Sequence, residues 1–230
     1  MEIFLYKLIL ISVVSYLIGS FPTAYLLVKK FTAKDIREVG SGNVGAMNVA
    51  RALKEKSKKL TAIGFLAVLI IDMAKGALAV FLAPKILLGS LIALILAAFF
   101  VILGHNYSIF LKFSGGRGAA CLIGILVYLD KLSFLVWGLI MIIASVIAQI
   151  VLEKIGLTQK IHWRKISEVI SLLGKQMIGR MAGLIFAPLF IYFYNPQIFP
   201  IAAVGTILLL IKNIPRVKGY LKNGGQLSND

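Results

Sequence analysis

Seven apolar runs, separated by short polar segments, constrain the fold of this chain more than any other feature. The runs cover about residues 3 to 28, 61 to 83, 86 to 103, 119 to 129, 132 to 152, 181 to 194 and 198 to 211. A helix needs about 20 apolar residues to cross the hydrocarbon core of a bilayer. The pattern therefore predicts an all-α, polytopic membrane protein with about seven transmembrane helices. The composition agrees, since 60% of the 230 residues are hydrophobic and the mean hydropathy is +0.94.

Two of these runs differ in length from an ordinary membrane span. The run at 119 to 129 has only about eleven residues, which is too short for a full crossing unless the glycine-rich loop before it dips into the membrane. The first run is too long for a signal peptide and lacks both a basic start and a small-residue cleavage site, so we expect it to be retained. We predict one integral membrane domain over residues 1–230.

The distribution of charge follows the same pattern. The chain has 25 Lys and Arg against 9 Asp and Glu, a net charge of +16, and 21 of the 25 basic residues lie in the segments 29–60, 104–118, 153–180 and 212–230. If all seven runs cross, these segments lie on one side, as the positive-inside bias requires, with the N-terminus outside and the C-terminus in the cytoplasm. Since topology explains the charge and no aromatic residues interleave it, nucleic acid binding is not expected.

Residues 153–180 predict a cytoplasmic, interfacial segment. Its large apolar residues recur at alternating spacings of three and four, which indicates an amphipathic helix on the inner membrane surface. They are Trp163, Ile166, Ile170, Leu173 and Met177. Metal and redox chemistry are not expected, because one cysteine and two histidines without a cluster offer neither a disulfide nor a ligand set.

The stretch "GSGNVGAMNVAR", residues 40–51, is unusually polar for such a chain. Its three glycines allow sharp turns that present N–H groups to an anion, and a helix is predicted to begin near Ala46. Asn48 and Arg51 are three residues apart on that helix, so they share a face and converge on one phosphate, with Ser41 donating into the same pocket. The alternative is a solvated basic loop whose glycines only make turns.

A second polar stretch, "GHNYSIFLKFSGGRGAAC", covers residues 104–121. Its "GGRG" directly precedes an apolar helix, so free N–H groups and the positive end of the helix dipole face the loop, with Arg117 beside them. Such a loop binds phosphate. Lys112 adds a charge, and His105 can exchange protons near neutral pH, although a lone histidine also serves as an interfacial hydrogen-bonding residue.

Two ionisable residues lie inside the second apolar run, in "LIIDMAKGALAV". Asp72 and Lys75 each cost a few kcal/mol in a membrane helix, roughly on insertion scales, and such residues usually face the interior of the bundle. Three possibilities remain open: direct substrate contact, a structural pair, and orientation of an arginine of the first loop by Asp72. The basic tail "LLIKNIPRVKGYLKNGG" is similarly either a topology signal or a ligand site.

Taken together, "GSGNVGAMNVAR", "DMAKG" and "GHNYSIFLKFSGGRGAA" resemble the bacterial acyl-phosphate:glycerol-3-phosphate acyltransferase family, as does the earlier "GSFPTAYLLVKKF". The resemblance covers about residues 16 to 125. It implies an enzyme of the bacterial cytoplasmic membrane, without a cofactor, that moves a fatty acyl group from acyl phosphate to the 1-hydroxyl of glycerol 3-phosphate. The products would be lysophosphatidic acid, for phospholipid synthesis, and inorganic phosphate.

The resemblance also implies site residues. It marks as candidate catalytic residues Ser41, Arg51 and His105, and as candidate substrate-binding residues Asn43, Asn48, Asp72, Lys75, Lys112, Gly115, Gly116, Arg117, Gly118 and Lys212. Arg117 stands where the family usually has lysine, so a planar fork replaces a point charge. Acyl phosphate is already activated, so positioning and charge neutralisation suffice, and the departing phosphate or His105 takes the hydroxyl proton. A covalent serine mechanism is the lesser alternative, because no Ser-His-acid order is evident.

The third family motif, near the C-terminus, matches poorly. Asn213 replaces a histidine, Arg216 an asparagine and Gly225 a glutamate, and only Lys212 and Lys218 keep a comparable charge. This leaves open a divergent member with altered substrate, altered rate or no activity. A transporter of a phosphorylated solute is a further alternative, disfavoured because we find no internal repeat and expect the polar groups at one face rather than at the midplane.

Overall fold

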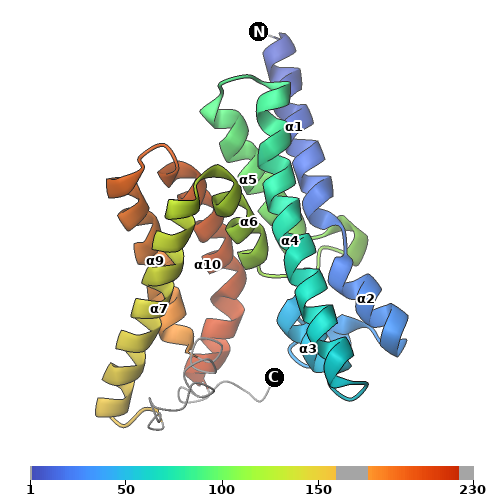
Figure 1. Cartoon of the computed structure of the whole chain (residues 1–230), viewed down its shortest axis with the longest axis vertical. Helices are drawn as coiled ribbons and strands as arrows, with labels where there is room; N and C mark the ends of the chain where they lie inside the picture. Colours follow the sequence, from blue (N-terminus) through green and yellow to red (C-terminus); the bar gives the residue numbers. More distant parts are fainter. Residues whose placement is uncertain (1, 159–175, 223–230) are drawn as a thin grey trace.

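The computed structural model of the protein describes residues 2–158 and 176–222, and the regular elements of this part of the chain are all helices (Figure 1). The helices are α1 (Glu2–Ser20), α2 (Thr23–Thr32), α3 (Ala46–Leu53), α4 (Lys58–Ile86), α5 (Leu91–Asn106), α6 (Ala119–Leu129), α7 (Lys131–Lys154), α9 (Met177–Tyr194) and α10 (Phe199–Lys222). Two short 3-10 helices, η1 (Ile36–Glu38) and η2 (Ile109–Leu111), lie in the loops that follow α2 and α5. The all-α prediction is confirmed.

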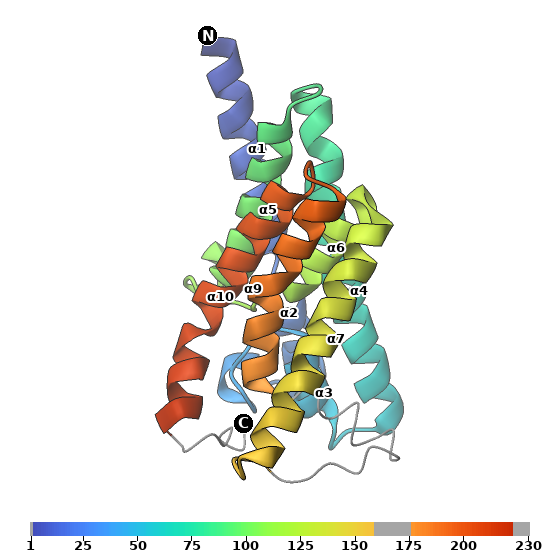
Figure 2. The ribbon, with the colours of Figure 1, turned by 90° about the vertical axis from the view of Figure 1, so that its left-hand side faces the viewer.

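Five helical segments of the described chain are long and apolar enough to cross a membrane, whereas α5 and α6 have only 16 and 11 residues. At 1.5 Å per residue, α5 and α6 are about 24 Å and 16 Å long, less than the roughly 30 Å of a bilayer core. The chain segment that joins them therefore lies part-way along the longer helices (Figure 1), with Ile109, Phe110 and Phe113 exposed. The number of crossings stays a prediction; α1 begins and α10 ends at opposite ends of the molecule (Figures 1 and 2), as an odd number would require.

The first apolar run, predicted as one span, is broken at Phe21-Pro22 into α1 and α2. Proline has no N–H to donate, and its ring disfavours the helical conformation of the preceding residue. The break leaves the carbonyl of Phe21 inside the bundle, where it accepts a hydrogen bond from Lys75. The structure thus places a polar backbone group in the middle of an apolar run.

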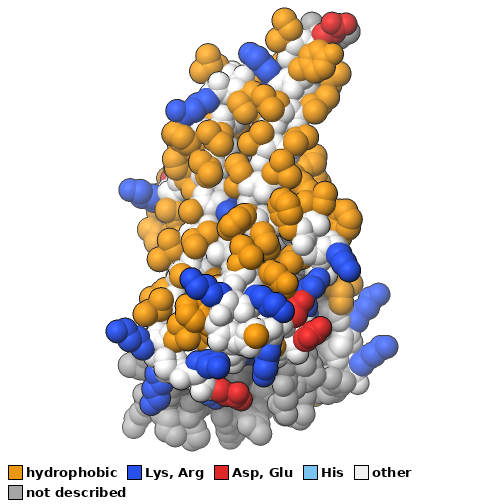
Figure 3. Space-filling model, turned by 90° about the vertical axis from the view of Figure 1, so that its right-hand side faces the viewer, with side chains coloured by type: hydrophobic (Ala, Val, Ile, Leu, Met, Phe, Trp, Pro, Cys, Tyr) orange, Lys and Arg blue, Asp and Glu red, His pale blue; other side chains and the backbone are white. Residues whose placement is uncertain are grey.

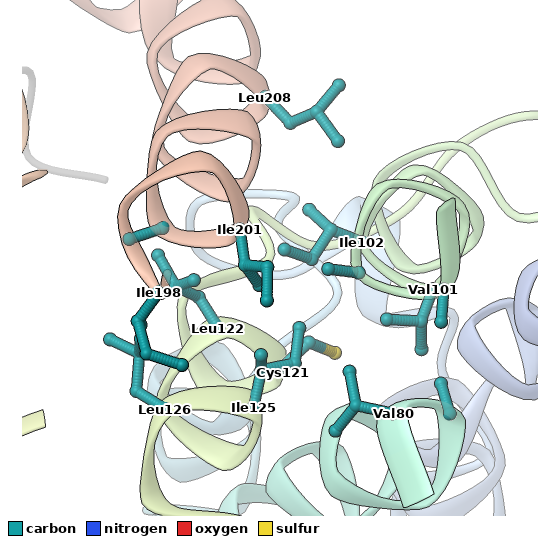
Figure 4. Packing of buried hydrophobic residues seen from close by; sticks show 14 of the residues in the cluster. Val80, Val101, Ile102, Cys121, Leu122, Ile125, Leu126, Ile198, Ile201 and Leu208 are labelled. Carbon is teal, nitrogen blue, oxygen red and sulfur yellow. The ribbon is translucent and has the colours of Figure 1, made fainter. Parts of the chain in front are cut away.

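The two short helices form the centre of the bundle. α5 contacts α1, α4, α6 and α10, and α6 contacts α4, α5, α7 and α10. α9 lies between α7 and α10 (Figure 2). A buried cluster joins these helices, and Figure 4 shows Cys121, Leu122 and Ile125 of α6 facing Val80 of α4 and Ile201 of α10.

Glycines bring the central helices into backbone contact. A Cβ at Gly76 of α4 would overlap the carbonyl of Cys121, and a Cβ at Gly124 of α6 would overlap the carbonyl of Met73. α1 and α5 are joined in the same way, by Gly19 and Gly104. Since no side chain lies between these backbones, the depth of α6 relative to α4 is fixed by the backbones themselves.

The interfacial segment predicted at 153–180 lies mostly outside the described residues, including Trp163, Ile166, Ile170 and Leu173. Its last members are described. Met177 is 1% exposed and begins α9, which packs against α7, so residues 177–180 belong to a helix of the bundle, and the interfacial position of the segment stays a prediction. On the face in Figure 3, hydrophobic side chains cover the upper and middle parts, and most Lys and Arg gather near the lower end.

Candidate active site

The first loop, residues 33–45 between α2 and α3, is held in shape by its own polar groups. The Asp35 carboxylate accepts a hydrogen bond from the Arg37 backbone N–H at 2.9 Å and begins η1. Gly40 and Gly42 adopt left-handed φ values of 53° and 64°, which side chains rarely tolerate. The predicted sharp turns therefore exist, and α3 begins at Ala46 as expected.

Asn48 fixes this loop from within. Its side-chain amide donates to the carbonyls of Ile36 and Val39 at 3.0 and 2.8 Å, and its Oδ1 accepts from the Ser41 backbone N–H at 3.1 Å. With 1% exposure and both N–H donors occupied by loop carbonyls, Asn48 has no donor left for a phosphate. The expectation that it joins Arg51 on one phosphate is therefore replaced: Asn48 holds the loop.

Arg51 lies on the same face of α3 as Asn48, as predicted. A Cβ at Gly40 would meet the Asn48 Oδ1 at 2.5 Å and the Arg51 Cδ at 3.2 Å, so both side chains lie against this glycine. Arg51 is exposed, whereas Ser41 and Asn43 are half-buried. The guanidinium of Arg51 is thus open to a ligand, and the Ser41 hydroxyl and the Asn43 amide are partly accessible.

Arg37 links the first loop to the loop that follows α5, a contact that the sequence did not reveal. Its guanidinium pairs with Asp35 at 2.5 Å and donates to the Leu111 carbonyl at 3.2 Å. The hydrogen bond from Arg37 holds the pKa of the Asp35 carboxyl below its usual value, and the same pairing raises the pKa of Arg37. Both groups are therefore charged at neutral pH, and the link is ionic.

Asp72 and Lys75 form a buried pair halfway along α4. The Lys75 Nζ donates to the Asp72 Oδ1 at 2.7 Å and to the Phe21 carbonyl at 2.6 Å. The two residues are only 3% and 6% exposed. Of the possibilities left open, this geometry shows the structural pair: Lys75 neutralises Asp72 and also satisfies the carbonyl freed by the α1–α2 break.

His105 lies between this pair and the GGRG loop, residues 115–118. Its Nδ1 is 3.9 Å from the Asp72 Oδ1, and its backbone carbonyl accepts from the Gly116 N–H at 2.9 Å. A Cβ at Gly116 would overlap the His105 Nε2 and would lie 2.7 Å from the carbonyl of Val44 in the first loop. The two polar stretches therefore meet at Gly116, with the imidazole beneath them.

The rest of the GGRG loop shows why glycine is needed there. A Cβ at Gly115 would overlap the His105 carbonyl, and Gly118 has a φ of 80° and precedes α6 as its N-cap. Gly116 already donates its N–H to His105, whereas the first N–H groups of α6, at Ala119 and Ala120, have no intrahelical acceptor and remain open to an anion. Of the loop glycines expected to bind phosphate, Gly116 therefore has no free N–H.

The cations of the second loop are placed differently from one another. Lys112 adopts a φ of 54° at the end of η2 and is exposed, whereas Arg117 is half-buried within the loop. Lys212 of α10 donates to the Asn106 carbonyl at 2.6 Å, lies 4.1 Å from the ring centroid of Tyr107, and interacts electrostatically with Arg117. Lys212 thus joins the C-terminal helix to the end of α5.

Residues of the diverged third motif take unremarkable positions. Asn213 is 7% exposed and donates to the Leu209 carbonyl of its own helix. Arg216 is half-buried and Lys218 exposed, and Gly225 lies outside the described residues. Of the third motif, Lys212 reaches the loops of the site through the Asn106 carbonyl.

Several residues that the sequence reasoning missed tie α1 to the second loop. Tyr16 donates to the Tyr107 carbonyl at 2.7 Å, and Ser108 donates to the Ser20 carbonyl at 2.5 Å. Their positions just before "FPTAY" and just after "GHN" were the only available signal. Together they fix the start of the second loop against the end of α1.

A cavity of about 10 Å³, with room for about one water, lies at the α1–α2 break. Its lining includes Thr23, Asp72, Lys75 and His105. The Thr23 hydroxyl is buried and has no hydrogen-bond partner within the part of the chain that the structure describes. The cavity also touches Val44 and Gly115, so the polar interior continues from the buried pair to both loops. Over the same part, no three of His, Cys, Asp or Glu come together as metal ligands would.

The depth of the site differs from expectation. The polar groups were expected near the cytoplasmic side, but Asp72 is the fifteenth residue of α4, about 21 Å along the helix from its start at Lys58. His105 and Gly116 lie beside it, because α5 and α6 are short. Depth therefore no longer argues against a transporter, and the choice rests on the relatives of the chain.

Comparison with known proteins resolves that choice. The chain is 44% identical over 140 residues to glycerol-3-phosphate acyltransferase 2 of Moorella thermoacetica. This alignment covers 59% of this chain and 68% of the relative. It is 39% identical over 145 residues to glycerol-3-phosphate acyltransferase of Carboxydothermus hydrogenoformans, covering 61% and 69%.

A solved structure has a similar fold over almost the whole length. The glycerol 3-phosphate form of PlsY (YgiH), an integral membrane glycerol 3-phosphate acyltransferase, aligns with a TM-score of 0.67 at 23% identity, covering 95% of this chain and 94% of that one. A family model described as Glycerol-3-phosphate acyltransferase matches residues 9–223. This chain therefore belongs to the glycerol-3-phosphate acyltransferase family.

Proposed function

We propose that this protein is a glycerol-3-phosphate acyltransferase that uses acyl phosphate as donor and supplies lysophosphatidic acid for phospholipid synthesis. Family membership supports the reaction class. The observation that carries the proposal for the site is the meeting of the first loop and the GGRG loop at His105, where Gly116 contacts both the imidazole and Val44. Two phosphorylated substrates need two anion-binding elements within reach of one another.

The reaction makes one bond and breaks one. The 1-hydroxyl oxygen of glycerol 3-phosphate attacks the acyl carbon, the bond from that carbon to the phosphate oxygen breaks, and the hydroxyl proton passes to the departing phosphate or to His105. Because the donor is a mixed anhydride, no acyl-enzyme is needed, and catalysis consists of positioning and charge neutralisation.

In the proposed site, the cations neutralise phosphate charge and the uncharged donors orient the substrates. Arg51, Lys112 and Arg117 neutralise the two phosphates, and Ser41 and Asn43 orient the acyl phosphate. The start of α6 receives a phosphate through its first N–H groups. Three residues act as positioning residues, since their polar groups are bonded within the protein: Asn48, Lys75 and Lys212.

The position of His105 makes it a suitable proton acceptor. Its ring is 8% exposed, its Nδ1 faces the Asp72 carboxylate at 3.9 Å, and its Nε2 lies against Gly116. At this distance the carboxylate does not hydrogen-bond the ring, but its negative charge favours the imidazolium that forms when His105 accepts a proton. The variant His105→Asn distinguishes the two proposed proton acceptors, His105 and the departing phosphate. A large loss of kcat with unchanged KM assigns the proton to His105, whereas a retained kcat assigns it to the phosphate.

The decisive assay measures phosphate released from palmitoyl phosphate by the purified protein in detergent, with and without glycerol 3-phosphate. Arg51→Ala should abolish the acceptor-dependent release, because it removes the guanidinium on the open face of the first loop. Lys56→Ala is the matched control, since Lys56 is an exposed cation in the turn that follows α3. Equal activity of both variants would contradict the site assignment.

The same assay tests whether the family scaffold is catalytic here. Folded, monodisperse protein that releases no phosphate above background would favour a non-catalytic or altered-substrate member, in line with Asn213 and Arg216 in the third motif. Acceptor-dependent release would show that the third motif is replaceable.

A further inference from the structure

A groove of about 300 Å³ lies between α3 and α4, and none of its lining residues belongs to the site described above. Its walls are one face of each helix: Ala50 and Lys54 are one turn apart on the α3 side, and Lys58, Thr61, Ala62 and Phe65 follow at helical spacing on α4. The helices approach closely because Gly64 receives Leu53 and Val49 of α3. The groove is thus part of a packed hairpin.

The groove changes character along its length. At the turn between the helices, Lys54 and Lys58 are both exposed, and neither takes part in an ion pair within the described residues. Further along α4, the lining becomes Ala62 and Phe65, inside an apolar stretch whose Ile63 and Leu66 are 52% and 51% exposed. A basic end followed by an apolar end is complementary to a phospholipid, with its headgroup at one end and a chain at the other.

The surroundings favour a lipid over a water-soluble partner. Exposed Ile63 and Leu66 on a helix long enough to cross a membrane face hydrocarbon, so the apolar end of the groove opens to acyl chains. The turn itself is basic: residues 51–59 carry five Lys or Arg and one Glu. Basic residues next to a membrane helix attract anionic headgroups.

We propose that the α3–α4 groove binds one anionic phospholipid, with its phosphate between Lys54 and Lys58 and an acyl chain along Ala62 and Phe65. Since α3 also carries Asn48 and Arg51, a lipid held there fastens the helix on which the first loop rests. The proposal concerns a lipid of the membrane that is neither substrate nor product, and it does not depend on the acyltransferase activity.

Native mass spectrometry of the full-length protein in a mild detergent tests this, with dioleoyl phosphatidylglycerol and dioleoyl phosphatidylcholine as probes. We expect one phosphatidylglycerol to bind in preference to phosphatidylcholine. Each lysine near the membrane surface contributes about 1 kcal/mol to binding of an anionic lipid, or about a fivefold change in affinity. Lys54→Gln/Lys58→Gln should therefore weaken phosphatidylglycerol binding about 25-fold to 30-fold. The control pair Lys56→Gln/Lys59→Gln removes the same charge from exposed positions outside the lining and should change binding less than about threefold.

A third variant distinguishes binding of the lipid within the groove from general electrostatic attraction to the basic surface. Ala62→Phe fills the apolar end, keeps every charge and should abolish the bound phosphatidylglycerol. Equal weakening by the two lysine pairs, or unchanged binding in Ala62→Phe, would overturn the proposal. Displacement of the lipid by glycerol 3-phosphate alone would also overturn it, because the groove would then be a site for free phosphate. Each variant must elute as the same monodisperse species as wild type.

Discussion

Replacement of Gly116 with alanine tests whether the two loops meet at His105. The new Cβ would overlap the His105 Nε2 and would lie 2.7 Å from the Val44 carbonyl. To restore an ordinary contact of 3.4 Å, the first loop must retreat by about 0.7 Å, and the imidazole must turn away as well. A single methyl group therefore separates the parts that the proposed mechanism brings together.

The size of the effect follows from these contacts. Overpacking of a close-packed site costs about 1–3 kcal/mol. If that strain is relieved by displacing the imidazole and the first loop, the same free energy is lost from the transition state. At about 1.36 kcal/mol per tenfold, kcat/KM should fall between roughly 5-fold and 150-fold. The stability of the bundle should change little, because the moved groups belong to loops and to one side chain.

The assay is steady-state kinetics with palmitoyl phosphate and glycerol 3-phosphate, together with thermal unfolding in detergent. Gly138→Ala is the matched control, since a Cβ there meets nothing within 4 Å and α7 is remote from the site. It should retain full activity and gain up to about 1 kcal/mol of helix stability. Wild-type kinetics in Gly116→Ala would refute the reasoning, as the loops could not then be in contact during turnover.

Three further predictions address the groups beneath the loops. Asn48→Asp should lower kcat/KM by about 30-fold or more, because it removes both donors to the loop carbonyls and leaves each unsatisfied at about 1–3 kcal/mol, or about 2–6 kcal/mol in total. Steady-state kinetics check this, and wild-type kinetics in Asn48→Asp would contradict it. Lys75→Met should destabilise the protein by about 3–5 kcal/mol, measured by thermal unfolding, because Asp72 stays buried without its partner, and the double variant Asp72→Asn/Lys75→Met should recover much of the loss. The pairing with Arg37 lowers the pKa of Asp35 in the folded protein. The ionised Asp35 carboxylate therefore contributes its full stabilisation of the loop above the ordinary carboxyl pKa of about 3.9. This stabilisation is lost as the pH falls through the lowered pKa of the folded state. Hydrogen exchange in residues 33–45 should therefore show no Asp35-dependent change between about pH 5 and 8 and a loss of protection in acid that Asp35→Asn removes.

Local patterns in the sequence predicted local structure well. Glycine before an amphipathic stretch set the start of α3 at Ala46, and the eleven-residue apolar run became α6 with the expected bounds. The expectation that a crossing here requires the glycine-rich loop to dip into the membrane follows from the same shortness and stays a prediction. Propensity and length were sufficient here because each inference concerned one segment and its own termini.

Inferences that depended on tertiary contacts were less reliable. Asn48 was expected to bind phosphate, but burial against Ile36 and Val39 occupies its donors, and no local pattern distinguishes an outward amide from an inward one. Pro22 was a signal for the α1–α2 break, yet its importance depends on Lys75, which lies 53 residues later and reaches the freed region. The depth of the site could not be predicted either, since it depends on how α5 and α6 pack.

The glycine contacts between α4 and α6 also restrict how substrates reach the site. Gly76 and Gly124 each place backbone against backbone, so this pair has no side-chain rotamers that can rearrange to open a passage. The same is true where Gly19 and Gly104 join α1 to α5. Four helices thus act as a rigid wall behind the imidazole. Substrates must then reach the site on the side of α2, α3 and the two loops rather than between these paired helices.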